Sequence, residues 1–475
     1  MGGKTLWLTL VTLAGLAAGF AREWLLVAAW GGGGQSDAFV LALFVPEAVR
    51  MTLAGGLLAS AALPIFRALD AIGRRQWLSM LVPQMLLIAL AMTAVLGVGA
   101  SQWAALLGSG LSPEGRVQVA ANLQWLAWCL PGFVIHALLA IPLQAHDRYV
   151  LAGLGSLLFN LPPTFYLAWS GAAASDENLA ASCVLGSSLM WLPLLVATWT
   201  QGWRPWNISA RPEALRELCA RLWPLLGSNL ASHGLALMER MIASLLGEGV
   251  LTWVNLARKL VNLPLVALMS LNQVLLGLMS AKQGGQRLAI LQQGIAITSV
   301  LSLPAAVAMA GAAPALVYWL LPASSSTGPL PMLLTWFALP LVFGAWNAML
   351  ARYAYAGGDT GLPLRCELTG SLANALLLLA LPILCGAAGI ALAAWGGAVL
   401  TGWLLMRQMR LRHALPWRQQ WGLSLVMLAL ARLLLFPVPS PLLQLLLTSL
   451  CSAVLLAWLL FWLRPWKVVL PSASE

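Results

Sequence analysis

Charged residues are scarce in this sequence, where Asp, Glu, Lys and Arg together make up 9% of 475 residues. Soluble globular proteins have roughly a quarter of their residues charged, so the composition excludes a soluble domain. Hydrophobic residues instead make up 60% of the chain, and the mean hydropathy is +0.85. We therefore expect a polytopic membrane protein.

Cysteine and histidine are also few, with six and four copies that lie far apart. No C-x-x-C spacing occurs, so neither a disulfide framework nor a metal site is indicated. An intramembrane transferase would need carboxylates or histidines that converge on a metal or an acceptor. The 15 acidic residues are too dispersed for that. We therefore expect no enzyme activity and no cofactor.

Apolar windows of about 20 residues, the length that a helix needs to cross a bilayer, recur along nearly the whole chain. Ten-residue segments of alternating hydrophobicity, typical of membrane barrels, are missing. The sequence predicts an all-α polytopic helical bundle with about 14 transmembrane helices. The predicted spans are 6–30, 37–62, 78–100, 118–142, 149–170, 178–200, 220–247, 250–280, 288–311, 328–352, 363–384, 386–406, 420–438 and 440–463.

The formal net charge of +11 would suit a nucleic-acid partner, but the positions of the cations argue against one. With the N-terminus inside, 19 of the 26 Lys and Arg residues fall on the same side of the membrane. Only Arg116 lies in a connection on the other side, together with Asp176 and Glu177. This asymmetry follows the positive-inside rule. It predicts that both termini are cytoplasmic and that the chain binds membrane lipids rather than nucleic acid.

A polar connection near the middle of the chain divides it into two halves. Each half opens with a span that carries adjacent opposite charges, "FAREW" in the first and "LMERM" in the second. Two related lobes around a central cavity are typical of transporters with such a repeat. We expect an N-terminal lobe over 1–205 with six spans, a C-terminal lobe over 206–412 with six more, and two final spans over 413–475.

Six cations lie within predicted spans, and a charge at the centre of a membrane helix costs about 2.5–3.5 kcal/mol on an insertion scale. They are therefore expected to face a polar interior, although Arg432 could instead snorkel to a span end. These cations are Arg22, Arg50, Arg240, Arg258, Lys259 and Arg432.

Acidic partners within the spans are fewer than the cations. Glu47 and Arg50 are three residues apart and share a helix face, so they could pair. Arg22 and Glu23 are neighbours, about 100° apart around a helix, and each is expected to find its main partner elsewhere. The surplus cations predict an anionic ligand, since the planar arginine fork suits a diphosphate. The alternative is that these charges form ion pairs between helices that only fix the geometry of the lobes.

Three stretches carry a resemblance to a known family. They are "GFAREWLLVAAWGGGGQSDAFVLALFVPEAVRMTLAGGLLASAALPIF" at the start, "LGEGVLTWVNLARKLVNLPLVAL" in the second half and "YAYAGGDTGLP" before the eleventh span. Together they contain 82 residues, about a sixth of the chain, and resemble the lipid II flippases of the MurJ (MviN) family. That family belongs to the multidrug/oligosaccharidyl-lipid/polysaccharide exporter (MOP) superfamily.

The resemblance implies which residues bind the substrate. Arg22 and Arg50 match the family's arginines of the first and second spans, and Lys259 falls at a third arginine site with Arg258 beside it. Glu23 replaces the usual aspartate, and Asp37 lies in the matching S-D-A-F motif. The family's acidic residue of the second span is here Gly55. The resemblance also implies a groove for the lipid tail in the last two spans.

The leading functional hypothesis is therefore a flippase of the bacterial inner membrane. It would move an undecaprenyl-diphosphate-linked saccharide, lipid II or a related precursor of peptidoglycan and the cell wall, by alternating access. The departures from the family pattern leave an exopolysaccharide or O-antigen lipid as an alternative. A drug or cation exporter of the same superfamily, and a scaffold for cell-envelope synthesis proteins, are further alternatives. The membrane potential or a monovalent cation could drive the cycle.

Overall fold

The structure is a computed structural model that describes residues 2–53, 57–204, 213–321, 328–413 and 440–464, with scattered positions from 415 to 433. For residues 2–6, 223–232, 264–271 and 273–274 it describes the backbone alone. Every regular element in this part of the chain is helical, which confirms the all-α prediction. Most of the thirteenth predicted span lies outside the described residues, and so do Gly55 and Arg432.

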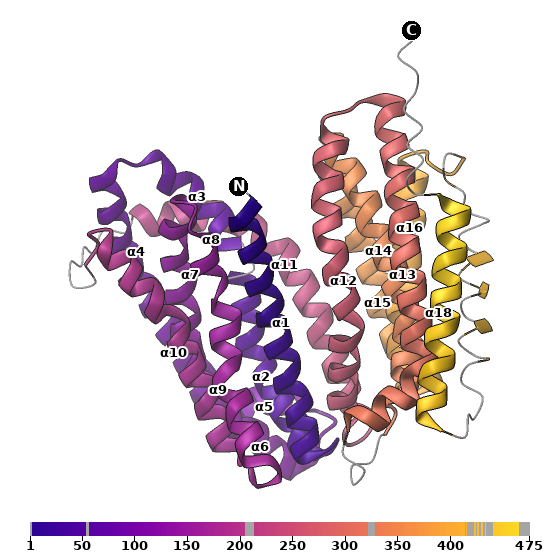
Figure 1. Cartoon of the computed structure of the whole chain (residues 1–475). Coiled ribbons are helices and arrows are strands. Elements are labelled where there is room, and N and C mark those ends of the chain that lie inside the picture. The colour runs from indigo at the N-terminus through magenta and orange to yellow at the C-terminus, as the bar shows by residue number, and fades with distance from the viewer. Residues whose placement is uncertain are drawn as a thin grey trace. The chain divides into compact units, whose positions relative to one another are not determined.

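Two compact units divide the chain, Met1–Thr252 and Trp253–Glu475. The N-terminal unit contains α1 (Gly2–Trp30), α2 (Gly34–Thr52), α3 (Leu58–Ala68), α4 (Ala71–Val98), α5 (Ala100–Leu107), α6 (Pro113–Leu126), α7 (Cys129–Ala145), α8 (Tyr149–Gly153), α9 (Gly155–Ser170), the 3-10 turn η2 (Gly171–Ala173), α10 (Asp176–Thr200) and α11 (Glu213–Leu245). The helix α12 (Val250–Ser280) begins at the end of this unit and continues into the next. The C-terminal unit continues with α13 (Gly284–Leu320), α14 (Leu330–Ala356), α15 (Gly361–Cys385), α16 (Ala388–Gln408) and α18 (Pro441–Leu463) (Figure 1).

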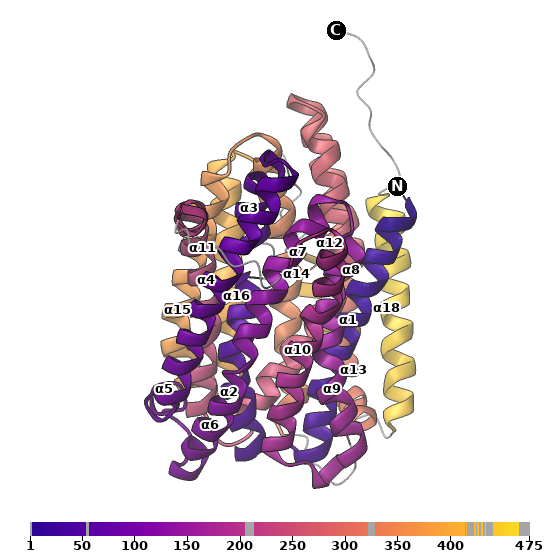
Figure 2. The ribbon, with the colours of Figure 1, turned by 90° about the vertical axis from the view of Figure 1, so that its left-hand side faces the viewer.

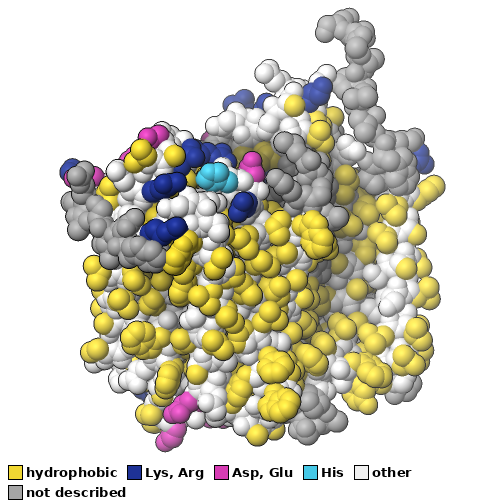
Figure 3. Space-filling model, turned by 60° about the vertical axis from the view of Figure 1, so that its left-hand side comes forward, with side chains coloured by type: hydrophobic (Ala, Val, Ile, Leu, Met, Phe, Trp, Pro, Cys, Tyr) yellow, Lys and Arg dark blue, Asp and Glu magenta, His cyan; other side chains and the backbone are white. Residues whose placement is uncertain are grey.

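Ten described helical segments are long and apolar enough to cross a membrane. In Figure 3 a band of hydrophobic side chains covers the helices, and a group of Lys and Arg residues lies above it at one end. This pattern is typical of a surface that faces a membrane. The last predicted span begins at a helix cap, Ser440, and the sixth begins three residues after the cap Ser175. Ser112, Ser175 and Ser440 each accept a backbone N–H from the first turn of the helix that follows, which satisfies a donor that the helix leaves unpaired.

The second predicted span, written as one segment over 37–62, contains α2 and α3 in the structure. Helix α2 ends at Thr52 and α3 begins at Leu58. The flanking residues Leu53 and Leu57 keep helical backbone angles, and residues 54–56 between them lie outside the described residues.

Helix α7 is the buried centre of the N-terminal unit, where it packs against α10, α4 and α3 (Figure 2). Glycines allow the close approach of its neighbours. A Cβ on Gly132 would lie 2.6 Å from the backbone oxygen of Ser187 in α10, and a Cβ on Gly186 would overlap the backbone oxygen of Phe159 in α9. Small residues at such crossings let membrane helices pack through their backbones. This packing fixes the positions of Phe133 and Phe159.

Candidate functional site

Arg22 lies on the inner face of α1, and its side chain is only 1% exposed. Its Nη2 atom donates to Oε1 of Glu23 at 2.6 Å and to Oε1 of Glu47 at 2.9 Å. Glu47 comes from α2, so the guanidinium joins the first two helices. Among the described residues this is the main group of charges buried within the N-terminal unit.

The expectation that Arg22 and Glu23 would each look elsewhere was wrong for this pair. The angle between neighbouring residues on a helix is about 100° at the Cα atoms, but the arginine side chain is long and flexible. It can bend back along the helix until its guanidinium meets the carboxylate of the next residue. The other half of the expectation is confirmed, because Arg22 also pairs with an acid on another helix.

Arg50 completes the group from one turn further along α2. Its Nη2 atom lies 3.9 Å from Oε1 of Glu47, which confirms the predicted pairing at a spacing of three residues. The side chains of Arg50 and Glu47 are 16% and 17% exposed, so they are the accessible members of the group. We call these four residues, Arg22, Glu23, Glu47 and Arg50, the N-terminal charge cluster.

The expected surplus of cations is not found within this cluster, because its two arginines face two glutamates. What is in surplus is hydrogen-bond donors. Nε and Nη1 of Arg22 and Nε of Arg50 are buried and have no hydrogen-bond partner among the described residues. A buried donor without an acceptor costs about 1–3 kcal/mol, and more when it is charged. A ligand that brings several anionic oxygens would satisfy these donors.

Two phenylalanine rings form the apolar wall of the cluster. The Phe159 ring centroid lies 5.6 Å from the Arg22 guanidinium carbon and 5.0 Å from that of Arg50. The Phe133 ring lies 5.9 Å from the same atom of Arg50 and packs edge-on against Phe159. Cations within about 6 Å of an aromatic face are attracted by its quadrupole. The rings thus hold both guanidinium groups while leaving their donors available.

The carboxylate of Asp37, a predicted site residue, bonds to backbone groups at the start of α12. Its buried carboxylate accepts the backbone N–H groups of Gly249 at 2.6 Å and Thr252 at 2.8 Å, and the Thr252 hydroxyl at 2.6 Å. These donors stand at the start of α12, where helices leave N–H groups unpaired and favour a negative charge. Asp37 is thus a cap that ties α2 to α12. A contact between Asp37 and the substrate stays a prediction.

Glycine makes this cap possible. Gly249 has a φ of +81°, a left-handed conformation that side chains other than glycine rarely adopt. A Cβ at this position would also lie 2.6 Å from the backbone oxygen of Gly32. The α1–α2 and α11–α12 connections therefore meet backbone to backbone. The run of glycines after Trp30 serves this contact.

Replacing Asp37 with Asn is expected to lower the unfolding temperature of the detergent-solubilised protein by about 3–6 °C. The amide would present N–H groups to a donor and would lose charged hydrogen bonds worth roughly 1.5–3 kcal/mol. Thermal unfolding followed by tryptophan fluorescence measures the change. Asp176→Asn is the matched control, because Asp176 is only partly buried and accepts a bond from Gln35. An equal, small shift in both variants would contradict the cap.

The remaining predicted site residues lie on α12. Arg258 and Lys259 are partly buried, and both belong to the C-terminal unit. The Arg258 guanidinium carbon lies 4.8 Å from the ring centroid of Phe337 on α14. The structure therefore brings Arg22, Glu23 and Arg50 together in one unit and places Arg258 and Lys259 in the other.

Glu47 and the two phenylalanines are members of the site that the predicted set did not include. Glu47 has a visible signal, because it stands three residues before Arg50. Phe133 and Phe159 have no such signal in the sequence, since an aromatic residue in an apolar span usually packs against helices or lipid. Only the fold of α7 and α9 shows that their rings meet the arginines.

Comparisons with known proteins agree with this architecture. The family model described as lipid II flippase MurJ matches residues 26–462. The lipid II flippase MurJ of Burkholderia cenocepacia is 25% identical over 323 residues, a match that covers 63% of this chain. The chain spans about three-fifths of the length of that curated relative, as the match covers 61% of it.

Two solved structures share the fold. A lipid II flippase MurJ in an inward closed conformation superposes with a TM-score of 0.85 at 17% identity, over 97% of this chain and 99% of the other. An inward-facing multidrug resistance transporter of the MATE family, in the MOP superfamily, gives 0.69 at 16% identity, over 85% and 99%. At such identities the similarity establishes the fold alone.

Proposed function

The chain belongs to the lipid II flippase MurJ family, and from this premise we propose that it moves a polyprenyl-diphosphate-linked saccharide across the bacterial inner membrane. Lipid II or a related precursor is the proposed substrate, and undecaprenyl is the proposed lipid. Both termini would lie in the cytoplasm, as the distribution of Lys and Arg predicts. Alternating access of the two units would carry the headgroup while the tail stays in lipid.

The observation that carries this proposal is the set of buried guanidinium donors without acceptors in the N-terminal charge cluster. Arg50 is the accessible cation, and its ion pair with Glu47 is long at 3.9 Å. A diphosphate could displace Glu47 from Arg50, because phosphate oxygens accept two parallel bonds from a guanidinium. Arg22 would then keep Glu47 in place through its 2.9 Å bond. Arg22 would position the site and would meet the ligand only after a rearrangement.

The same cluster argues against a drug or cation exporter of the superfamily. A binding site for organic cations needs an excess of carboxylates, whereas here the buried carboxylates are already paired with arginines. The guanidinium N–H groups that remain without partners can only donate, so they favour anionic ligands. For the same reason the carrier of a lipid-linked exopolysaccharide or O-antigen unit stays the nearest alternative, because its diphosphate presents the same chemistry to the site.

The membrane potential is the proposed energy source, because it acts on the charged headgroup as the headgroup crosses the membrane. Transferring one elementary charge across the membrane involves about 2.3 kcal/mol per 100 mV. A headgroup with several negative charges would therefore be driven outward by a potential that is negative inside. We expect transport in liposomes to rise when a potassium diffusion potential makes the compartment that the headgroup leaves negative. Transport that does not respond to the potential would instead indicate that a bound cation balances the charge of the headgroup.

A substitution at Lys259 tests whether the third arginine site of the family is present in the C-terminal unit. Replacing Lys259 with Arg should preserve or improve transport of the lipid-linked substrate, because a guanidinium adds the forked geometry to the same charge. Transport by the purified protein in liposomes, with a fluorescent lipid-linked saccharide, measures the effect. Arg258→Lys is the matched exchange. If Lys259→Arg were inactive and Arg258→Lys were damaged, Arg258 would be the phosphate contact instead.

A further inference from the structure

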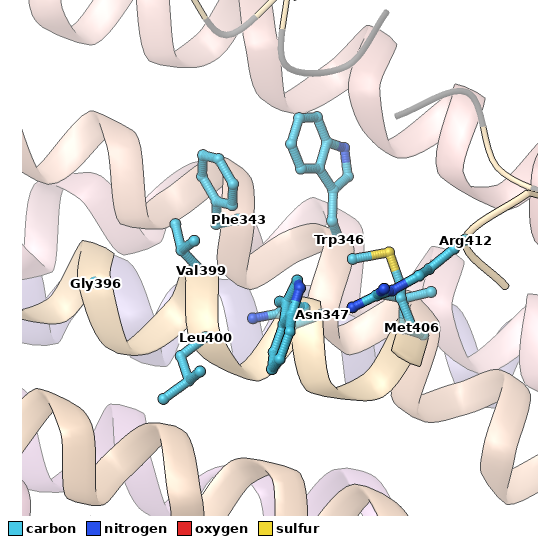
Figure 4. A pocket seen from close by; sticks show the side chains of 11 residues that line it. Phe343, Trp346, Asn347, Gly396, Val399, Leu400, Met406 and Arg412 are labelled. Carbon is cyan, nitrogen blue, oxygen red and sulfur yellow. The ribbon is translucent and has the colours of Figure 1, made fainter. Parts of the chain in front are cut away.

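The C-terminal unit contains a cavity of about 460 Å³ between α14 and α16 (Figure 4). Its walls are almost entirely apolar, with Phe343 and Trp346 on α14 and Val399 and Leu400 on α16. Arg412 lies at one end beside Met406, away from Gly396 at the other end (Figure 4). An apolar cavity with a cation at one end complements an anionic amphiphile, which has an apolar tail and a negatively charged head.

A second cation stands beside Arg412. The Trp403 ring centroid lies 5.2 Å from the guanidinium carbon of Arg407 and 5.3 Å from that of Arg412. The two guanidinium carbons are therefore at most about 10.5 Å apart, and neither group forms an ion pair with a described residue. Two cations in the same region repel each other, and an anion bound near both would relieve that repulsion. Arg407, Trp403 and Arg412 form what we call the α16 basic end.

The sequence around the α16 basic end supplies no carboxylate for it. Residues 368–474 contain seven Lys or Arg residues and no Asp or Glu. These cations are Arg407, Arg410, Arg412, Arg418, Arg432, Arg464 and Lys467. Apart from Glu367 on α15, which packs against α16, the nearby sequence brings no carboxylate, so an anion from outside the chain would complement this region. Basic pockets between membrane helices on the cytoplasmic side bind the headgroups of anionic lipids, and the Lys and Arg distribution assigns this end of α16 to the cytoplasm.

We propose that the cavity binds one acyl chain of an anionic phospholipid from the cytoplasmic leaflet, with the phosphate held by Arg412 and Arg407. A cavity of about 460 Å³ is in the size range of sites for drug-sized ligands. It therefore suits one acyl chain better than a polyprenyl tail, which is several times longer. This site is separate from the proposed diphosphate site and does not depend on it.

The phosphate, rather than the chain, gives the site its selectivity. A lipid tail leaves surroundings that are as apolar as the cavity, so its entry gains little from the hydrophobic effect. The bonds between guanidinium groups and phosphate are charge-assisted and bidentate. A zwitterionic phospholipid brings the same chain, but its own ammonium group competes with the arginines. Binding should therefore follow the charge of the headgroup when the acyl chains are kept identical.

Photo-crosslinking of the purified full-length chain tests this proposal without any transport substrate. Phosphatidylglycerol with a diazirine near the end of one acyl chain is expected to label peptides of α14 and α16 at least fivefold more than phosphatidylcholine with the same chain. The double variant Arg407→Gln, Arg412→Gln should abolish the difference. Leu400→Trp fills the cavity and should reduce labelling although both arginines remain. Arg464→Gln is the matched control, because Arg464 is exposed and stacks on Phe461 away from the cavity.

Three results would overturn the proposal. Equal labelling of the unaltered chain by the two lipids would remove the role of the headgroup, and this result needs no variant that folds. Unchanged labelling in Leu400→Trp would show that the acyl chain lies outside the cavity. Stronger labelling of the same peptides by a diazirine-bearing polyprenyl phosphate would assign the cavity to the transported lipid instead.

Discussion

An Arg50→Gln variant is expected to insert and fold normally but to transport lipid-linked diphosphate at least 10-fold more slowly. Arg50 is the accessible cation of the N-terminal charge cluster, and its ion pair with Glu47 is long, so little stability depends on it. Each charge-assisted hydrogen bond to phosphate contributes about 1.5–3 kcal/mol, and 1.4 kcal/mol is about a factor of ten in rate. Flipping of a fluorescent lipid-linked saccharide in liposomes measures the loss.

The matched control for Arg50 is Arg74→Gln. Arg74 belongs to the same unit and also stacks on a phenylalanine, with its guanidinium carbon 5.6 Å from the Phe66 ring. It lies on α4, outside the N-terminal charge cluster, so its loss should leave transport within about twofold of the unaltered rate. Equal rates for Arg50→Gln and the unaltered protein would remove Arg50 from the substrate site.

Replacing Arg22 with Met is expected to lose both stability and transport. The change leaves Glu23 and Glu47 without their common cation in a buried site. Breaking a buried ion pair from one side costs about 3–5 kcal/mol, because a charge remains without compensation. The variant should accumulate poorly and unfold at lower temperature in detergent. By itself this result would not separate a role in transport from a role in folding.

The double variant Arg22→Met, Glu23→Gln separates the two roles. It removes one charge of each sign and leaves the Glu47–Arg50 pair in place. Exchanging a buried ion pair for uncharged groups of similar size is often neutral for stability, so folding should return. Transport should stay low, because Glu47 would then be free to pair more closely with Arg50 and compete with the diphosphate. Recovery of transport together with folding would show that Arg22 serves only the structure.

The helices and the location of the charge cluster could be predicted because the bilayer imposes strong rules. Backbone groups in hydrocarbon must bond within a helix or a closed barrel, so apolar windows fix the elements. Charged side chains are costly there, so Arg22 and Arg50 stand out in the sequence. Their assignment to the protein interior needs no knowledge of the fold.

The partners of those charges could not be predicted from spacing. The bond between Arg22 and Glu23 depends on the path of a long side chain, which residue numbers do not describe. Asp37 entered the predicted site through the S-D-A-F motif of the resemblance. Its hydrogen-bond partners Gly249 and Thr252 are more than 200 residues away in the chain. Only the meeting of two glycine-containing connections reveals the cap.

The aromatic wall illustrates the same limit. Phe133 and Phe159 differ in no visible way from other aromatic residues of the spans. The glycines at 132 and 186 let α7, α9 and α10 approach closely, and this packing turns the rings toward the arginines. A pattern of residues reports which side chains a helix carries, whereas the neighbours of each side chain follow from how several helices pack.

Equilibrium binding of two lipids, polyprenyl diphosphate and polyprenyl monophosphate, tests the central claim most directly. The account predicts that the unaltered protein binds the diphosphate about 10-fold more tightly, as one additional charge-assisted contact would give, and that Arg50→Gln binds both lipids alike. Both lipids carry the same tail, so the difference reports only the headgroup. Equal affinities for the two lipids in the unaltered protein, or a preference that survives in Arg50→Gln, would contradict it.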